Sequence, residues 1–172
     1  LPICHSYETP LIMTDRPELA IITGCDGVHI GQEDTDYETT RIMIGQDRII
    51  GVTCKNSRHL AVEAVENGAE YVAFGAFFTT NTKQGTTPAE LETVRWWNEM
   101  TTVPSVVIGG ITIENCQPLI SAGADFLAIV GGVWDHPEGE VAAIKAFNKA
   151  FENHCVNLIV YKFDRHYRVS HC

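Results

Sequence analysis

Short apolar segments alternate with amphipathic segments along the chain from about residue 10 to residue 152. Most of the apolar segments end in glycine or in a cluster of polar residues. Continuous apolar runs of this length are typical of strands buried on both faces, and the amphipathic segments have the apolar spacing of helices. The pattern therefore predicts repeated strand–helix units, with a parallel sheet covered by helices.

Six strands and six helices follow from this pattern. The expected strands are 10–13, 27–30, 49–52, 71–74, 105–108 and 126–130. The expected helices are 17–22, 37–44, 57–67, 88–100, 114–122 and 139–152. Glycine C-caps are expected where a helix turns into the next strand, at Gly24, Gly68 and Gly123. No Gly/Ser/Pro-rich linker interrupts the units, so we expect a single domain over residues 1–154 and a separate tail over residues 155–172.

Two α/β architectures fit this alternation, an open doubly wound sheet and a closed (β/α) barrel. Both place functional residues just after the carboxyl ends of the strands. Regular units with small residues at strand ends favour the barrel, and these residues are Gly31, Gly75, Gly109 and Gly131.

Composition and charge narrow the classes of function. The 172 residues are 45% hydrophobic and 20% charged, which is typical of a folded protein. No apolar run is long enough to span a membrane and no leader-like segment opens the chain, so we expect a cytoplasmic location. A formal charge of −10 disfavours nucleic acid and anionic membranes as partners. The six cysteines lack metal-site spacing, and we expect buried thiols.

The stretch from Gly75 to Thr87 is the segment most suited to holding a phosphate group. It follows a predicted strand, precedes a predicted helix and contains four threonines between Thr79 and Thr86, together with Lys83. Hydroxyl and backbone N–H groups donate to phosphate oxygens, and lysine adds a positive charge. An ordinary polar surface loop is the alternative.

Acidic residues follow the first two predicted strands. Asp15 and Asp34 can each cap the helix that follows, or the two can share one Mg²⁺ at the same end of the sheet. Thr53 offers a hydroxyl at the same level after the third strand. His29 lies inside a strand, and we interpret it as a packed interior histidine or as one that supports a neighbouring site residue, rather than as a general base. The Gly-Gly pairs at Gly109 and Gly131 open loops whose backbone can approach a phosphate.

Several of these segments together resemble the thiamine-phosphate synthase family, in order and at the family's spacing, from about residue 6 to residue 152. The matching segments are Thr14-Asp15-Arg16, Gly27-Val28-His29-Ile30-Gly31-Gln32-Glu33-Asp34, Ile49-Ile50-Gly51-Val52-Thr53, Thr80-Asn81-Thr82-Lys83, Ile108-Gly109-Gly110-Ile111 and Ala122-Gly123-Ala124-Asp125. The resemblance implies a TIM-type (β/α) barrel enzyme, a transferase of thiamine biosynthesis. It would join a hydroxymethylpyrimidine diphosphate to a phosphoethyl thiazole and release pyrophosphate.

The resemblance also implies a role for each candidate residue. It makes Asp15 and Asp34 the Mg²⁺ ligands, and Thr53 and Lys83 the contacts to pyrophosphate, with Lys83 stabilising the leaving group. The remaining substrate-binding positions that it implies are Thr14 for the pyrimidine, Thr80 and Thr82 for the thiazole, and Gly110, Val130 and Gly131 for the thiazole phosphate. The partners would be phosphorylated small molecules, and an oligomer of identical chains is compatible with the sequence.

Three departures separate the chain from the family pattern. Most members carry Asn where this chain has Thr14, and many carry Ser where it has Gly131. The family's first two βα units have no counterpart here, so we expect about six of the eight units. The second of these units ends in a Gln-x-Arg-x-Lys cluster that holds the pyrimidine diphosphate in the family. Without that cluster we expect weak or no turnover. Residues 155–172 match nothing in the family. They could add a strand at the sheet edge, exchange between subunits, or lack selected structure, which is the interpretation we favour.

Two other functions remain open. A related thiazole tautomerase would share the barrel but would need a positioned general base. A degenerate, noncatalytic barrel fragment would bind a phosphate ligand or only a partner chain.

Overall fold

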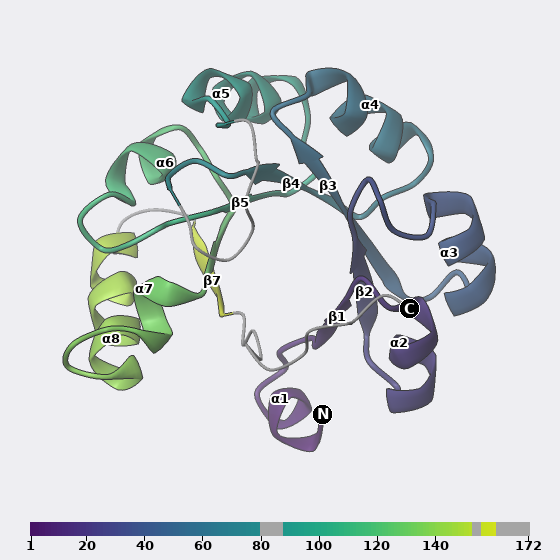
Figure 1. The fold of residues 1–172 in the computed structure, drawn as a ribbon, viewed down its shortest axis with the longest axis horizontal. Helices are drawn as coiled ribbons and strands as arrows, with labels where there is room; N and C mark the ends of the chain where they lie inside the picture. Colours follow the sequence, from purple (N-terminus) through teal and green to yellow (C-terminus); the bar gives the residue numbers. More distant parts are fainter. Residues whose placement is uncertain (80–87, 153–155, 161–172) are drawn as a thin grey trace, which may run out of the picture.

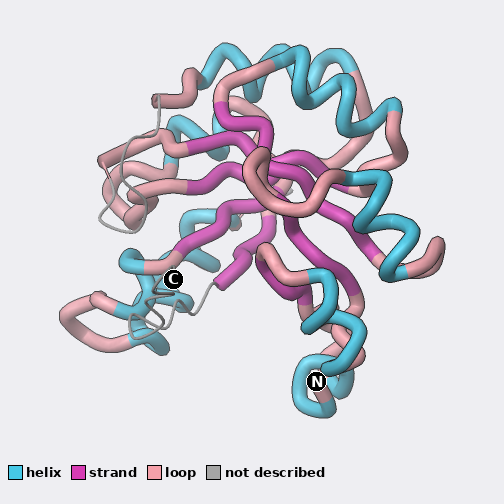
Figure 2. The backbone as a smooth tube through the Cα atoms, turned by 45° about the vertical axis from the view of Figure 1, so that its right-hand side comes forward, coloured by secondary structure: helices cyan, strands magenta, loops and turns pink. Residues whose placement is uncertain are grey.

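The computed structural model describes residues 1–79, 88–152 and 156–160. Seven parallel strands form one sheet, and each strand pairs with the next one in the sequence. The strands are β1 (Ile12–Thr14), β2 (Gly27–Ile30), β3 (Ile49–Lys55), β4 (Tyr71–Gly75), β5 (Ser105–Ile108), β6 (Phe126–Ile129) and β7 (Asn157–Val160). The sheet curls around an axis, and the helices lie on its outer side (Figures 1 and 2).

The helices alternate with these strands. They are α1 (Pro2–Ser6), α2 (Pro17–Thr23), α3 (Tyr37–Ile44), α4 (Arg58–Glu66), α5 (Leu91–Met100), α6 (Gln117–Ser121), α7 (Gly131–Trp134) and α8 (Glu140–Phe151). This curled parallel sheet covered by helices confirms the predicted α/β barrel-type fold. Within the three described ranges, no helix combines the length and apolar character needed to cross a bilayer. The cytoplasmic location stays a prediction.

Apolar side chains pack on both faces of the sheet. On the outer face, residues of neighbouring strands form the main core with the helices, and examples are Val28, Ile50, Val72, Val107 and Leu127. On the inner face, Ala73, Val106 and Ala128 form a smaller cluster. Side chains alternate between the two faces along each strand, so the residues between the core positions point toward the inside of the curl.

Local signals explain the helix ends that agree with the sequence prediction. Asp36 accepts a hydrogen bond from the Thr39 N–H at 2.9 Å, and α3 begins at the next residue, Tyr37. The Ser57 hydroxyl caps α4 in the same way, accepting from the Leu60 N–H at 3.2 Å. Such caps satisfy N–H groups that lack a partner inside the helix.

The end of the chain differs from the favoured prediction. Residues Asn157–Val160 form β7, parallel to β6, so the interpretation of the tail as lacking structure is wrong for these residues. The sheet therefore has seven strands rather than the expected six. Leu158 packs against the outer core and Ile159 against the inner cluster, so both faces of β7 contribute to burial. The division of the chain at residue 154 into a barrel domain and a tail stays a prediction.

Candidate functional site

The candidate residues that the structure describes lie at one end of the sheet. Consecutive strands are parallel and in register, so all of their carboxyl ends meet at the same edge. The candidates at this edge are Thr14, Asp15, Asp34, Thr53, Gly110, Val130 and Gly131. Thr80, Thr82 and Lys83 lie outside the described residues.

Asp15 turns the chain away from the end of β1. Its φ is 63°, in the left-handed region that aspartate tolerates better than most residues. Its N–H donates to the carbonyl of His29 at 2.8 Å, which ties its backbone to the neighbouring strand β2. The residue is half-buried.

Asp34 lies on that loop and is exposed. Its Oδ2 accepts a hydrogen bond from the N–H of Gly31 at 2.6 Å, which fixes the side chain over the end of β2. A Cβ at Gly31 would lie only 2.9 Å from this oxygen, so glycine leaves the room that the turn needs. The bond uses one of the two carboxylate oxygens.

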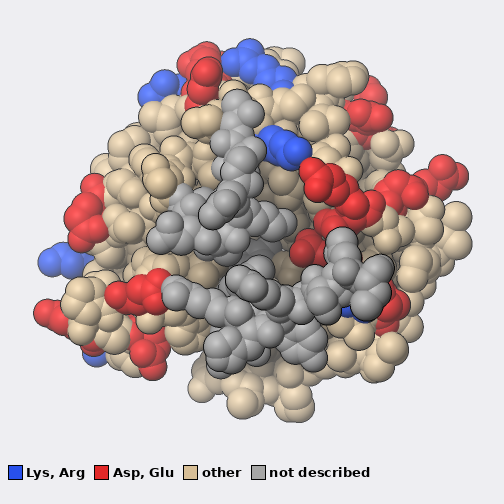
Figure 3. Space-filling view, in the orientation of Figure 1, with Lys and Arg blue, Asp and Glu red and all other residues tan. Residues whose placement is uncertain are grey.

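The donor chemistry of these two acidic residues fits Mg²⁺. Mg²⁺ is commonly bound through one or two carboxylates, with water and phosphate oxygens completing its shell. Among the described residues, no group of three or more His, Cys, Asp or Glu side chains could hold a metal ion. Figure 3 shows acidic side chains gathered on the side of this face where β2 leads into α3.

His29 connects Thr53 to the interior of the sheet. It is 8% exposed, as expected for an interior histidine. Its Nε2 lies 2.7 Å from the Thr53 Oγ1, and its Nδ1 lies 2.9 Å from the hydroxyl of Tyr71. The Gln32 amide donates to the Thr53 carbonyl at 2.7 Å and fixes the same end of β3. The hydroxyl of Thr53 is thus held by an ordered polar group.

Cys54 follows Thr53 but points into the core. It is fully buried, and burial raises the pKa of its thiol to about 12. A thiol with so high a pKa is neutral at physiological pH and is a poor nucleophile. The site therefore contains no thiolate at this position.

The stem of the threonine- and lysine-bearing loop is anchored at the ends of β4 and β5. The Phe78 N–H donates to the Gly109 carbonyl at 3.0 Å, and the Ala89 N–H donates to the Ala76 carbonyl at 2.8 Å. The backbone carbonyl of Thr79 packs against Gly110, where a Cβ would lie 2.5 Å from it. Gly110 also has a φ of 64°, so both space and backbone favour glycine. The described residues that flank segment 80–87 are therefore anchored at this edge.

Asn56 binds the residues that follow this loop. Its Oδ1 accepts from the N–H of Glu90 at 3.0 Å and from the hydroxyl of Thr93 at 2.8 Å. Glu90 is the N-cap residue of α5 and makes no side-chain cap of its own. Asn56, in the β3–α4 loop, thus caps α5, the helix that follows the threonine- and lysine-bearing loop.

The loops after β5 and β6 touch one another. A Cβ at Gly132 would lie 2.4 Å from the carbonyl of Ile111, so the backbone of α7 approaches the loop after β5 closely. Gly131, which begins α7, is exposed, and Val130 beside it is half-buried. The two predicted glycine pairs are therefore neighbours, as a shared phosphate cradle requires.

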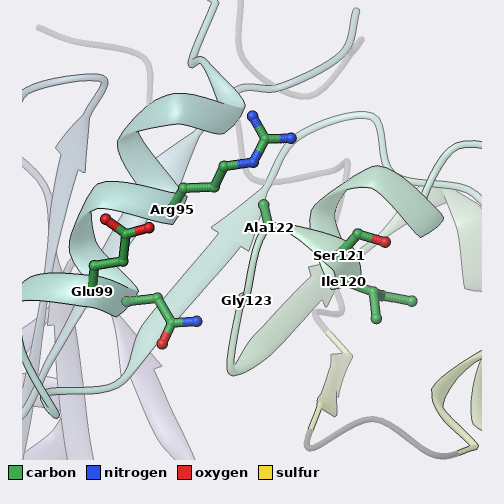
Figure 4. A pocket seen from close by; sticks show the side chains of 7 residues that line it. Arg95, Glu99, Ile120, Ser121, Ala122 and Gly123 are labelled. Carbon is green, nitrogen blue, oxygen red and sulfur yellow. The ribbon is translucent and has the colours of Figure 1, made fainter.

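A groove elsewhere on the molecule takes no part in this arrangement. It lies between α5 and α6 and is lined by Arg95, Asn98, Glu99, Ile120, Ser121, Ala122 and Gly123 (Figure 4). Both helices end there and lead into β5 and β6, so the groove lies at the amino-terminal end of the strands. Binding residues of parallel barrels lie at the other end.

The prediction from sequence missed Tyr71, Gln32 and Asn56 as parts of the site. Their contacts depend on strand register and on loop conformation, which the apolar pattern does not specify. Gly51 inside a predicted strand was the available signal, since glycine within a strand often marks close approach by another group.

The curled parallel sheet and the polar edge together define an α/β protein of the (β/α) barrel class, with its candidate site at the carboxyl ends of the strands. A family model described as thiamine monophosphate synthase matches residues 1–133. The chain belongs to the thiamine-phosphate synthase family.

Curated relatives and a solved structure support this assignment. A thiamine-phosphate synthase of Rhodospirillum centenum is 55% identical over 148 residues, covering 86% of this chain and 72% of the relative. One of Hyphomonas neptunium is 52% identical over 143 residues, covering 83% of this chain and 65% of the relative. Thiamine phosphate pyrophosphorylase from Pyrococcus furiosus superposes with a TM-score of 0.76 at 28% identity, covering 88% of this chain and 72% of that one. The chain thus spans about two thirds to three quarters of these proteins.

Proposed function

We propose that this chain carries the metal and thiazole parts of a thiamine-phosphate synthase site. In this proposal, the enzyme joins a pyrimidine diphosphate to a thiazole phosphate, and pyrophosphate leaves. Asp15 and Asp34 would hold Mg²⁺, which when bound supplies positive charge to the pyrophosphate oxygens. Family membership supports the reaction, and the chemistry of the two carboxylates supports the metal.

The protein's own groups would then position both phosphorylated ligands. Thr53 donates a hydrogen bond to pyrophosphate, and Lys83 neutralises charge on the leaving group. Thr80 and Thr82 bind the thiazole, whose phosphate rests against the backbone of Gly110, Val130 and Gly131. Thr14 contacts the pyrimidine. Holding two substrates in register accounts for much of the acceleration in such a reaction, and no protein nucleophile is required.

The observation that carries this proposal is the position of the loop stem beside Gly110. The carbonyl of Thr79 lies where a side chain at Gly110 would be, so the threonine- and lysine-bearing loop begins against the proposed phosphate cradle. The cradle lies at the same edge of the sheet as Asp15 and Asp34. Metal ligands, a cation and a phosphate cradle are the parts that release of pyrophosphate needs.

Calorimetric titration with the thiazole phosphate tests the cradle. We expect Gly110→Ala to weaken binding about tenfold, which corresponds to the loss of roughly one hydrogen bond to a charged group. The matched control is Gly24→Ala, which places alanine at a similar φ of 74° where no atom lies within 4 Å of the new Cβ. Absence of binding to the unchanged protein, or equal binding by both variants, would contradict the proposal.

A further inference from the structure

Tyr71, His29 and Thr53 form a hydrogen-bonded series that leads from the interior of the sheet to its carboxyl edge. The tyrosine hydroxyl contacts one imidazole nitrogen, and the threonine hydroxyl contacts the other. His29 is almost fully buried, whereas Thr53 is half-buried and retains exposed surface at the edge. The Thr53 end is therefore the more exposed end of the series.

Gly51 allows this series to exist. In the strand register, Gly51 of β3 lies between His29 of β2 and Tyr71 of β4. A Cβ at Gly51 would lie 1.9 Å from Cζ of the Tyr71 ring, so the ring occupies the space above the glycine. The ring crosses β3 in this way and stacks on His29, with centroids 5.5 Å apart and an interplanar angle of 21°. This packing gives the tyrosine hydroxyl its position on Nδ1.

The tautomer of His29 decides what Thr53 can offer a ligand. A neutral imidazole has one donor nitrogen and one acceptor nitrogen. If Nε2 carries the hydrogen, it donates to the Thr53 oxygen, and the threonine hydrogen remains available for a ligand. If Nδ1 carries it, Nε2 accepts the threonine hydrogen, and the hydroxyl then presents only lone pairs, which repel phosphate oxygens.

Tyr71 favours the first arrangement. A phenol is more acidic than an aliphatic alcohol, so the Tyr71 hydroxyl is a stronger hydrogen-bond donor to a ring nitrogen than the Thr53 hydroxyl is. When Tyr71 donates to Nδ1, the ring hydrogen must lie on Nε2 and point at Thr53. Each group in the series then donates its hydrogen toward the edge of the sheet, from Tyr71 to His29 and from His29 to Thr53.

We propose that Tyr71 is a positioning residue that acts through His29 to orient the Thr53 hydroxyl as a donor to a phosphate oxygen. The identity of the ligand, pyrophosphate with Mg²⁺, rests on the proposed function, whereas the direction of the hydrogen bonds does not. The two parts are therefore tested by separate measurements on the full chain.

Nitrogen NMR of the imidazole tests the direction of the series without any ligand. The unchanged protein should show Nδ1 as the acceptor nitrogen and Nε2 as the donor, and Tyr71→Phe should shift the ring toward the other tautomer or a mixture. Tyr37→Phe is the matched control, because its phenol bonds to Arg41 and lies outside the series. A donor Nδ1 in the unchanged protein, or a tautomer that Tyr71→Phe leaves unaltered, would overturn the proposal even if the protein binds no pyrophosphate.

A double-variant cycle tests the consequence for binding. Calorimetry with Mg²⁺ and pyrophosphate should show about tenfold weaker binding for Tyr71→Phe and at least as large a loss for Thr53→Val. Because Tyr71 acts only through Thr53, the double variant should bind no more weakly than Thr53→Val alone. Fully additive losses would overturn the proposal. Lack of binding by the unchanged protein would count against the proposed function and leave the NMR result to decide the inference.

Gly51→Ala provides a second route to the same outcome. The added methyl group displaces the tyrosine ring while keeping its hydroxyl, so it should reproduce the tautomer change of Tyr71→Phe. Thermal unfolding of each variant establishes that it is folded. A folded Gly51→Ala protein with an unchanged tautomer would contradict the role that we assign to the ring's position.

Discussion

At the scale of single residues, a few side chains join β-strands at the opposite end of the sheet from the site. Asp26 precedes β2, and its Oδ2 accepts from the Leu11 N–H at 2.7 Å. The same carboxylate contacts Nε2 of His5 at 3.0 Å. Arg41 of α3 plays a comparable part by donating to Glu70, just before β4, at 2.6 Å. These contacts hold the beginnings of the strands in register.

Asp26 should make stability depend on pH in acid. The Leu11 N–H, and next His5, lower the pKa of this carboxyl below its ordinary value. A lowered pKa in the folded state adds stability above about pH 4, and that stability is lost as the pH falls through the folded pKa. Urea unfolding between pH 7 and pH 2 should therefore show a shallower acid decline for Asp26→Asn. The exposed Asp47→Asn is the control, and an identical decline for Asp26→Asn and the unchanged protein would contradict this role.

At the scale of elements, the apolar pattern predicted six strands, and all six are present. Five of them lie within two residues of their expected ends, and β3 extends three residues further than expected, to Lys55. The range of α3 agrees with the prediction, and the structure shows that Asp36 caps its start. Helix α6 is shorter than expected, since a turn at Thr112 and Asn115 precedes it. The short α7 was missed because it has only four residues, too few to show a helical period.

The candidate site was predictable only in part. Glycine and acidic residues after strands indicated that the candidate residues would share one edge of the sheet, because parallel strands bring those ends together. The sequence did not indicate the contacts of Tyr71 with His29 or of Asn56 with Glu90, which join residues far apart in the chain. Such contacts depend on strand register and loop path, and Gly51 indicated only that some group approaches that point of β3 closely.

The contact from Asn56 to α5 gives a prediction at the element scale. Asn56→Ala removes the acceptor for the Glu90 N–H, so the first turn of α5 should lose about 1 kcal/mol of stability. Hydrogen exchange of the Glu90 amide should become faster. Asn56→Asp keeps the acceptor oxygen and should retain the slow exchange. Equal exchange rates in all three proteins would show that the contact does not hold the loop stem.

At the scale of the whole molecule, the sheet begins with β1 and ends with β7, and no pairing joins these two strands within the described residues. Strand β7 lies beside β6 and adds Leu158 and Ile159 to the two apolar layers. An exposed edge of a sheet invites association with other chains. We therefore expect β7 to contribute to stability and to limit aggregation through the edge of β6.

Two truncated chains test how much β7 contributes to stability. Ending the chain after residue 154 removes β7, and should lower the free energy of unfolding by about 2 to 4 kcal/mol through loss of two partly buried apolar side chains. Ending it after residue 160 keeps β7 and serves as the control. Chemical unfolding measures both, and light scattering reports aggregation. Equal stability of the two truncated chains would show that β7 adds nothing.

The central claim is that the edge of the sheet binds pyrophosphate through Mg²⁺ held by Asp15 and Asp34. The most direct measurement is the melting temperature with Mg²⁺ and pyrophosphate together, since a ligand stabilises a protein only when its site is formed. We predict a rise for the unchanged protein and for Glu33→Gln, an acidic neighbour on the same loop, but little or none for Asp15→Asn and Asp34→Asn. An unshifted melting temperature in the unchanged protein, or an equal rise in all four proteins, would contradict the account.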